Sequence, residues 1–151
     1  AVRSVESYHE KIGQAKPRNN IGVNVTGTAS VNATPGDVCG KVDDPPSVAE
    51  SATLRLNVVR DPPKIKPGIR VLLHAHAMNT PCELTAVETT DADGETSGMG
   101  VLTPGESGTV EVKFPEQVAL ERADEFPELG TILLRDNNET LAYGDVIELD
   151  P

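Results

Sequence analysis

The fold is decided by residues 129–149, which read Leu-Gly-Thr-Ile-Leu-Leu-Arg-Asp-Asn-Asn-Glu-Thr-Leu-Ala-Tyr-Gly-Asp-Val-Ile-Glu-Leu. Two apolar runs, Thr131–Arg135 and Thr140–Leu149, flank the polar link 136–139. Asn and Asp tolerate left-handed backbone and cap their own turns, so this link predicts a β-hairpin. Gly144 stands in the middle of the long second run, as glycine does where a strand bulges or bends round a barrel corner.

Short strand-like runs recur upstream of this hairpin. We expect strands at Ser51–Val59, Ile69–Ala77, Cys82–Glu88, Gly108–Phe114 and Val118–Leu120. Turn signals such as Lys66-Pro67-Gly68 separate them, and the polar, glycine-rich stretch from Thr89 to Ser107 is expected to be mostly loop. Several short strands without helical periodicity predict an all-β barrel.

The charge of the chain is unevenly distributed. Its 151 residues include 13 basic and 24 acidic side chains, for a net charge of −11. Residues 1–45 carry five of each sign, so the whole excess of acid lies in residues 46–151 and makes that part a poor general polyanion binder. An acidic surface of this kind fits both a high-salt cytoplasm and an ordinary acidic protein. No apolar run is long enough to cross a membrane, and we expect a soluble, cytoplasmic protein.

Catalytic and metal chemistry have little support in the sequence. We expect Cys39 and Cys82 to be reduced, half-buried thiols. His74 and His76 alternate on one strand and would share a face near Cys82, but the three lack a recognised zinc-ligand spacing, so no metal site is expected. No nucleophile elbow or triad motif is present, so we expect no catalytic residues and no enzyme activity from this chain.

The hairpin resembles the end of the last β-barrel of translational GTPases of the elongation factor 1-alpha and elongation factor Tu family. The residues that match this pattern are Leu129, Gly130, Arg135, Asp136, Thr140, Leu141, Ala142 and Gly144. Near the N-terminus, Val5-Glu6, Ile21–Val25 and Gly36–Gly40 resemble the second half of the middle barrel of elongation factor 1-alpha, with archaeal members the most similar. The resemblance covers nearly the whole chain.

The resemblance implies two domains. Residues 1–45 would form a partial middle β-barrel, and residues 46–151 a complete C-terminal antiparallel Greek-key β-barrel, with Pro45-Pro46 stiffening the boundary. The start of the chain inside a strand indicates a piece of a longer protein. The segment Gly36–Val42 is too short for a phosphate-binding loop, so GTP and Mg would belong to a domain that is absent and no cofactor is expected here. Unpaired strand edges in the partial barrel are expected to pack on the last barrel or to pair with a second copy.

Three residues near the N-terminus match the family's pocket for the acceptor end of tRNA. Glu6 corresponds to a glutamate that faces the terminal adenosine, Asn20 to an asparagine near the aminoacyl ester, and His9 to a position that often holds His or Arg. A carboxylate can accept a hydrogen bond from a ribose hydroxyl, and an amide can both donate and accept.

The last barrel is expected to contact the tRNA T-arm or a protein partner. The expected contact residues are Arg55, Lys64, Lys66, Arg70 and Asn137. The chain departs from the family pattern at two positions. Glu116 stands where the family usually has Lys, and Thr131 where archaeal and eukaryotic members commonly have Arg, and both changes weaken the attraction for phosphate. The resemblance therefore implies aminoacyl-tRNA and the ribosome as partners in the parent protein. The alternative is a release- or rescue-factor-type GTPase whose last barrel binds a tRNA-shaped protein.

Overall fold

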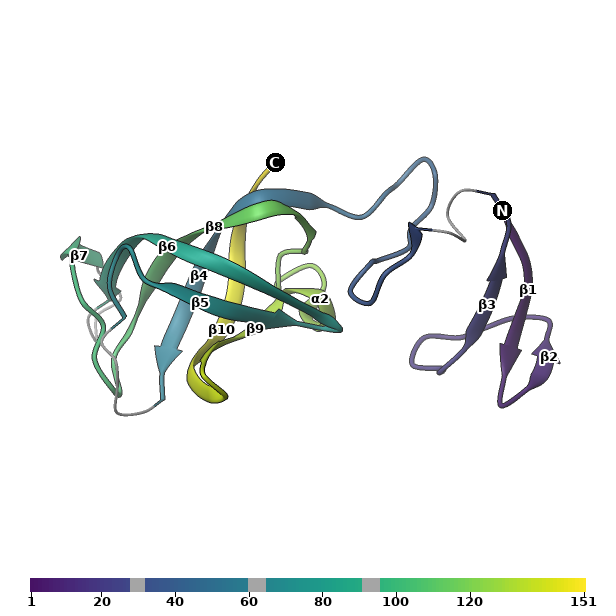
Figure 1. Ribbon diagram of the computed structural model, residues 1–151, viewed down its shortest axis with the longest axis horizontal. Coiled ribbons are helices and arrows are strands. Elements are labelled where there is room, and N and C mark those ends of the chain that lie inside the picture. The colour runs from purple at the N-terminus through teal and green to yellow at the C-terminus, as the bar shows by residue number, and fades with distance from the viewer. Residues whose placement is uncertain (28–31, 60–64, 91–95) are drawn as a thin grey trace. The chain divides into compact units, whose positions relative to one another are not determined.

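The computed structural model describes residues 1–27, 32–59, 65–90 and 96–151. The chain divides into two compact units, Ala1–Thr34 and Pro35–Pro151, which are considered separately (Figure 1). No helix among the described residues is long and apolar enough to span a bilayer.

The smaller unit is a three-stranded antiparallel sheet in the order β2-β1-β3. Its strands are β1 (Val2–Ser7), β2 (Glu10–Ile12) and β3 (Gly22–Val25). In the central strand β1, Glu6 pairs with Lys11 of β2 and with Gly22 of β3. The end of β1 and the starts of β2 and β3 therefore lie at the same end of the sheet.

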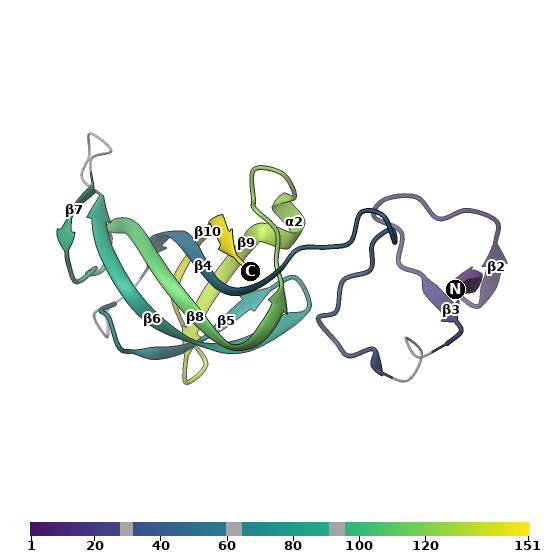
Figure 2. The same cartoon turned by 90° about the horizontal axis from the view of Figure 1, so that it is seen from above.

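The larger unit is an antiparallel barrel. Its strands are β4 (Val48–Val58), β5 (Arg70–Ala75), β6 (Met78–Thr90), β7 (Thr96–Met99), β8 (Ser107–Ala119), β9 (Thr131–Asp136) and β10 (Glu139–Asp150). The order is β5-β9-β10-β4-β8-β6, with β5 and β6 paired to close a six-strand ring and β7 added beside β6 (Figure 2). The consecutive strands β5, β6 and β8 are neighbours in the ring. The strand that precedes them in the chain, β4, lies on the far side of β8 instead of beside β5. This is the Greek-key arrangement that the sequence predicts.

Alternation of side chains builds the core of the barrel. In β4, Ala52, Leu54 and Leu56 are buried, whereas the intervening residues reach the surface, as expected for a sheet with one solvated face. The largest fully buried side chains come from strands and loops all around the ring: Leu54, Leu56, Ile65, Leu73, Leu84, Leu102, Leu120, Ile132 and Leu134. No charged or polar residue among those described is buried in this core.

The closing hairpin has the predicted boundaries to within a residue at each end. Strands β9 and β10 are joined by Asn137 and Asn138, both with positive φ (44° and 74°). Gly144 of β10 is opposite Leu56 of the paired strand β4, and a Cβ there would overlap the backbone carbonyl oxygen of Arg55. The register shifts of β10 lie on either side, at Thr140/Ala142 and Val146/Glu148, so the close approach of two backbones explains glycine at this position more directly than the expected bulge.

Three local expectations were wrong. The two strands expected at Gly108–Phe114 and Val118–Leu120 are one strand, β8, because the register with β4 shifts between Ala49 and Ser51 and accommodates the intervening Pro115. Strand β6 begins at Met78 instead of Cys82, since a tight turn joins it to β5. The chain before β9 forms a one-turn helix, α2 (Pro127–Gly130), which was not expected.

The segment after Thr34 belongs to the larger unit, whereas the predicted domain boundary follows residue 45. Gly36 approaches Met78, and Val38 shares a small apolar hollow with Pro46 and Leu120. Residues 35–45 thus cover part of the barrel, and the assignment of residues 1–45 to a partial middle barrel stays a prediction.

Candidate functional site

The three predicted acceptor-end residues gather at one end of the three-stranded sheet. Glu6 is half-buried near the end of β1, and the next residue, Ser7, donates from its Oγ to the backbone carbonyl of Asn20 at 3.2 Å. This bond holds Asn20 beside the last residues of β1. His9 lies in the turn that follows, exposed and with φ 68°. A carboxylate, an amide and an imidazole therefore stand at the same end of the sheet.

The described members of the predicted basic cluster lie on different elements of the barrel. Arg55 lies in β4 opposite Asp145 of β10 and Thr109 of β8, two strands away from β9. Lys66 is exposed in the turn before β5, and Lys64 lies outside the described residues. Among the described members, Arg70 lines a surface hollow together with residues of the closing hairpin.

Arg70 and Asn137 are brought together by strand register. In the β5–β9 pair, Leu72 is opposite Arg135, so the start of β5, which holds Arg70, lies beside the end of β9 that leads into the turn with Asn137. Between them lies a surface hollow of about 530 Å³, hereafter the hairpin hollow. It is lined by Arg70, Val71, Leu72, Pro81, Arg135, Asp136, Asn137 and Asn138. This lining contains two arginines and one carboxylate, a balance of charge that favours an anion.

The Arg70 side chain remains accessible although it is paired. Its Nε lies 3.1 Å from Oε2 of Glu83 on the neighbouring strand β6, with 81% of the Arg70 side chain exposed. An ion pair this exposed contributes little free energy, so Arg70 can exchange Glu83 for a phosphate at small cost.

Arg135 is a site residue that the sequence prediction missed. Its Nη2 donates to the backbone carbonyl of Asn138 at 2.7 Å, while its Nε is buried without a hydrogen-bond partner. A buried donor without a partner is costly, so the hydrogen bond that Nη2 makes to Asn138 leaves the Arg135 guanidinium only partly satisfied. The signal was present in the sequence, because Arg135 directly precedes the turn that contains the predicted contact Asn137.

His74 and His76 do not lie on one strand near Cys82, as their spacing in the sequence predicted. The strand β5 ends at Ala75, so His76 lies in the turn with φ 42°, and its Nε2 is 3.1 Å from the carbonyl oxygen of Ala119. Cys82 is buried, which raises its pKa to about 12, and Cys39 is exposed, so the expectation of two half-buried thiols was wrong for both. Among the described residues no group of three metal-ligating side chains is close enough to hold an ion.

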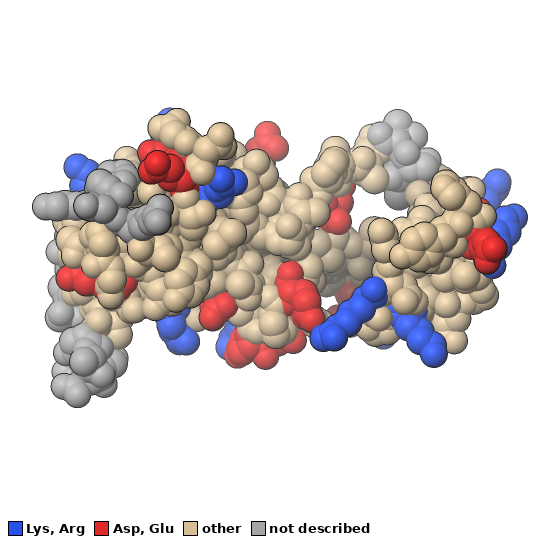
Figure 3. Space-filling view, turned by 90° about the horizontal axis from the view of Figure 1, so that it is seen from below, with Lys and Arg blue, Asp and Glu red and all other residues tan. Residues whose placement is uncertain are grey.

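The two units carry opposite net charge. The smaller unit has four basic and two acidic residues, a net of +2, whereas the larger unit has nine basic and 22 acidic residues, a net of −13. On the face drawn in Figure 3, Lys and Arg side chains project from the smaller unit beside a few acidic ones, and acidic and basic side chains both lie on the barrel. A polyanion is therefore attracted by the smaller unit, and any contact with the barrel depends on local groups such as those of the hairpin hollow.

Comparison with known proteins covers both units. A family model described as GTP-eEF1A C-terminal domain-like matches residues 51–147. Elongation factor 1-alpha of Halobacterium salinarum is 34% identical over 153 residues, which is 99% of this chain and 36% of that protein. Elongation factor 1-alpha of Pyrobaculum islandicum is 37% identical over 156 residues, which is 99% of this chain and 35% of that protein. This chain thus spans about a third of the length of these relatives.

Solved structures show the same fold at lower sequence identity. The crystal structures of Sup35 complexed with GDP and with GMPPNP each match with a TM-score of 0.88 at 20% identity. They cover 99% of this chain, which corresponds to 38% and 37% of theirs.

Proposed function

Because the chain belongs to the GTP-eEF1A C-terminal domain-like family and is a translation-factor domain, we propose that it binds aminoacyl-tRNA as the C-terminal region of an elongation factor 1-alpha-like protein. The parent protein would deliver the tRNA to the ribosome in the cytoplasm, and GTP with Mg would bind a domain outside this chain. The observation that carries the proposal is that relatives named elongation factor 1-alpha match 99% of the chain, including the positively charged smaller unit.

In this proposal the two units hold different parts of the tRNA. Glu6, His9 and Asn20 contact the acceptor end, where the half-buried carboxylate of Glu6 accepts a hydrogen bond from a ribose hydroxyl. In the barrel, Arg70 and Arg135 in the hairpin hollow contact the phosphate backbone together with Asn137. The acidic remainder of the barrel limits these contacts to a few phosphates.

Binding of the chain to aminoacylated and to deacylated tRNA tests the proposal. In a filter-binding assay the chain is expected to bind aminoacylated tRNA more tightly than deacylated tRNA. Equal affinity for the two forms would rule out the proposed acceptor-end site. In the barrel, Arg70→Ala is expected to weaken binding and to lower the slope of log K against log salt by about one. The matched control is Arg122→Ala, because Arg122 is also an exposed arginine in an ion pair, with Asp124, but does not line the hollow.

A second candidate function is favoured by an apolar patch on the outside of the barrel. Leu133 of β9 pairs with Tyr143 of β10 and with His74 of β5, and Leu72 lies nearby in β5. Leu72, Leu133 and Tyr143 are 39%, 41% and 48% exposed. Such a patch on an acidic barrel fits a protein partner, such as a tRNA-shaped release or rescue factor, better than it fits RNA. Binding of such a factor without any tRNA binding would favour this function over the first.

A further inference from the structure

We propose that Tyr8, at the tip of the β1–β2 hairpin, stacks on an unpaired nucleobase of the single-stranded end of a tRNA. The proposal rests on the proposed function, since it adds a base-stacking residue to the acceptor-end site. Tyr8 and His9 form the whole connection between Ser7 and Glu10, which are opposite each other in register. The tip therefore extends the same end of the sheet that holds Glu6 and Asn20.

The backbone at this tip is unfavourable for the residues that occupy it. Tyr8 has φ 51° and His9 has φ 68°, the left-handed region that suits Asn and Gly in two-residue hairpins. The closing hairpin of the barrel uses Asn137 and Asn138 for the same conformation, with φ 44° and 74°. A bulky aromatic residue with positive φ is a conformational outlier that costs free energy, and such outliers concentrate at ligand-binding positions.

Packing does not explain the aromatic ring either. Tyr8 is 91% exposed, so its ring contributes almost nothing to the interior of the smaller unit. The chain thus presents a large flat π-face to solvent at the end of a two-stranded hairpin. Nucleobases bind such faces by stacking, which depends little on sequence because every base has a π-face.

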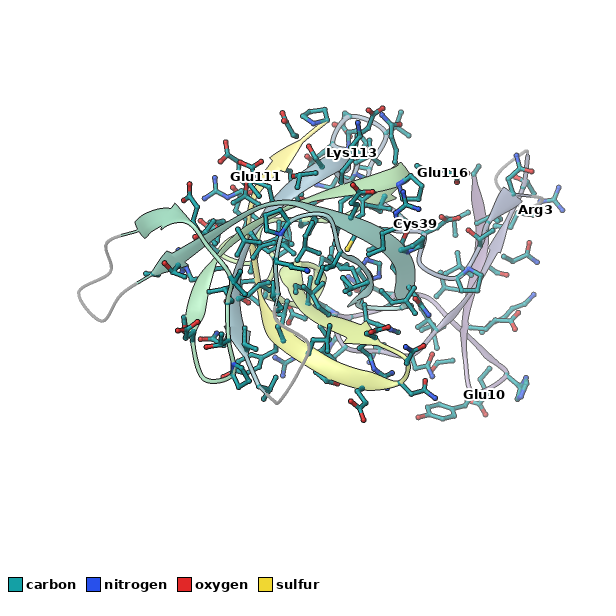
Figure 4. The ribbon with its side chains drawn as sticks, turned by 60° about the vertical axis from the view of Figure 1, so that its left-hand side comes forward. Arg3, Glu10, Cys39, Glu111, Lys113 and Glu116 are labelled. Carbon is teal, nitrogen blue, oxygen red and sulfur yellow. The ribbon has the colours of Figure 1, made fainter. Side chains whose placement is uncertain are left out.

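The charges near the tip favour a base over a phosphate. Glu10 directly follows the tip and Glu6 lies two residues before it, whereas Arg3 lies toward the opposite end of β1 (Figure 4). The nearest cation along the hairpin is Lys11, which is opposite Glu6 in register. Carboxylates repel a phosphate but leave the uncharged face of a base unaffected, so the contact of Tyr8 is expected to be nearly independent of salt.

The tyrosine content of the chain permits a direct test. The chain has two tyrosines and no tryptophan, so in a Tyr143→Phe variant Tyr8 is the sole fluorophore of its class. Titration of this variant with a short single-stranded RNA ending in CCA is expected to quench the Tyr8 fluorescence. Absence of quenching up to millimolar RNA would overturn the proposal.

Substitutions at Tyr8 distinguish an effect of the aromatic ring on RNA binding from an effect on the stability of the turn. With labelled RNA of the same sequence, Tyr8→Phe is expected to bind within twofold of the unsubstituted chain. Tyr8→Asn is expected to lose roughly 5- to 100-fold in affinity while its urea midpoint rises, because Asn suits the turn better. The salt slope is expected to stay unchanged. Stacking would be overturned by any of three results. These are unaltered RNA binding of Tyr8→Asn, an equal loss of affinity in Tyr8→Phe, or a change of about one in the slope of log K against log salt.

The outcome is separable from that of the proposed function. The RNA oligonucleotide carries no aminoacyl group, so quenching of Tyr8 can occur even if full tRNA is bound equally well with and without an amino acid. Conversely, selective binding of aminoacyl-tRNA that is unaffected by Tyr8→Asn would retain the proposed function and reject the role of Tyr8.

Discussion

Arg135 and Asn138 are joined across the closing turn of the barrel, with Nη2 of Arg135 donating to the Asn138 carbonyl at 2.7 Å. The acceptor residue Asn138 has a left-handed backbone, with φ 74°. We expect Asn138→Val to cost about 1–3 kcal/mol of unfolding free energy, because a β-branched residue is strained in that conformation. Asn138→Gly is expected to remain within about 1 kcal/mol of the original chain. Urea denaturation of the two variants checks this, and equal stability would contradict the role of the turn.

Glu116 is expected to oppose RNA binding. It is exposed on β8, where Figure 4 labels it (with Lys113 on the same strand). Glu116→Lys is expected to tighten tRNA binding and to steepen its salt dependence by about one phosphate contact. Glu128→Lys, an equal change of charge at an exposed position in α2, is the control for the effect of net charge alone. Identical salt slopes for the two variants would show that Glu116 is not near the RNA.

Gly144→Ala is expected to destabilise the barrel by roughly 1–3 kcal/mol or more, since its Cβ would overlap the carbonyl oxygen of Arg55 and strand β10 would have to move away from β4. Thermal unfolding measures the effect. Gly105→Ala supplies a contrast, because a Cβ at Gly105 meets no atom within 4 Å and only its φ of 85° opposes the change. A loss at Gly144 that did not exceed the loss at Gly105 would contradict the steric explanation.

The stability of the barrel is expected to fall in alkali through Cys82. Burial raises the pKa of the Cys82 thiol from its ordinary value of 9.0 to about 12, so the folded state favours the neutral thiol. The unfolded chain releases this proton above pH 9.0, and the contribution is lost progressively as the pH rises from there toward about 12. We expect the urea midpoint to fall over this range.

A Cys82→Ala variant isolates the contribution of this thiol. The variant is expected to be less stable at neutral pH, because the substitution leaves a cavity, and to show a weaker decline in alkali. If the urea midpoints of the two proteins fell in parallel with rising pH, the loss of stability in alkali could not be assigned to Cys82. Since Cys39 is exposed and Cys82 buried, a thiol reagent is expected to label only Cys39 in the folded protein.

Much of the barrel was predictable because its signals are local. The resemblance to the elongation factor 1-alpha family is confirmed, and the all-β barrel with it. The hairpin at residues 129–149 follows from two residues that tolerate the turn and from the apolar runs beside them. The continuity of β8 through Pro115 was not predictable, because it depends on a register shift against β4, a strand more than fifty residues earlier in the chain.

The candidate site was predictable only in part, because strand order is not a local property. Arg55 and Arg70 are close in sequence, yet β10 and β9 lie between their strands in the ring. Conversely, Arg70 and Asn137 are far apart in sequence, yet the pairing of β5 with β9 brings both to the lining of one hollow. The roles of Glu6, His9, Asn20, Lys66 and the hairpin hollow in binding stay predictions, as does pairing of the smaller unit with a second copy.

Closure of the ring by β5 and β6 limits how a partner can attach to this barrel. With the backbone hydrogen bonds of those two strands used within the ring, a visiting peptide cannot extend the sheet there as an additional strand, and its recognition must rely on side chains. Surface residues are also the ones whose replacement perturbs folding least. Substitutions at outward positions such as Glu116 and Thr131 are therefore expected to change the surface that a partner meets while the architecture of the barrel stays the same.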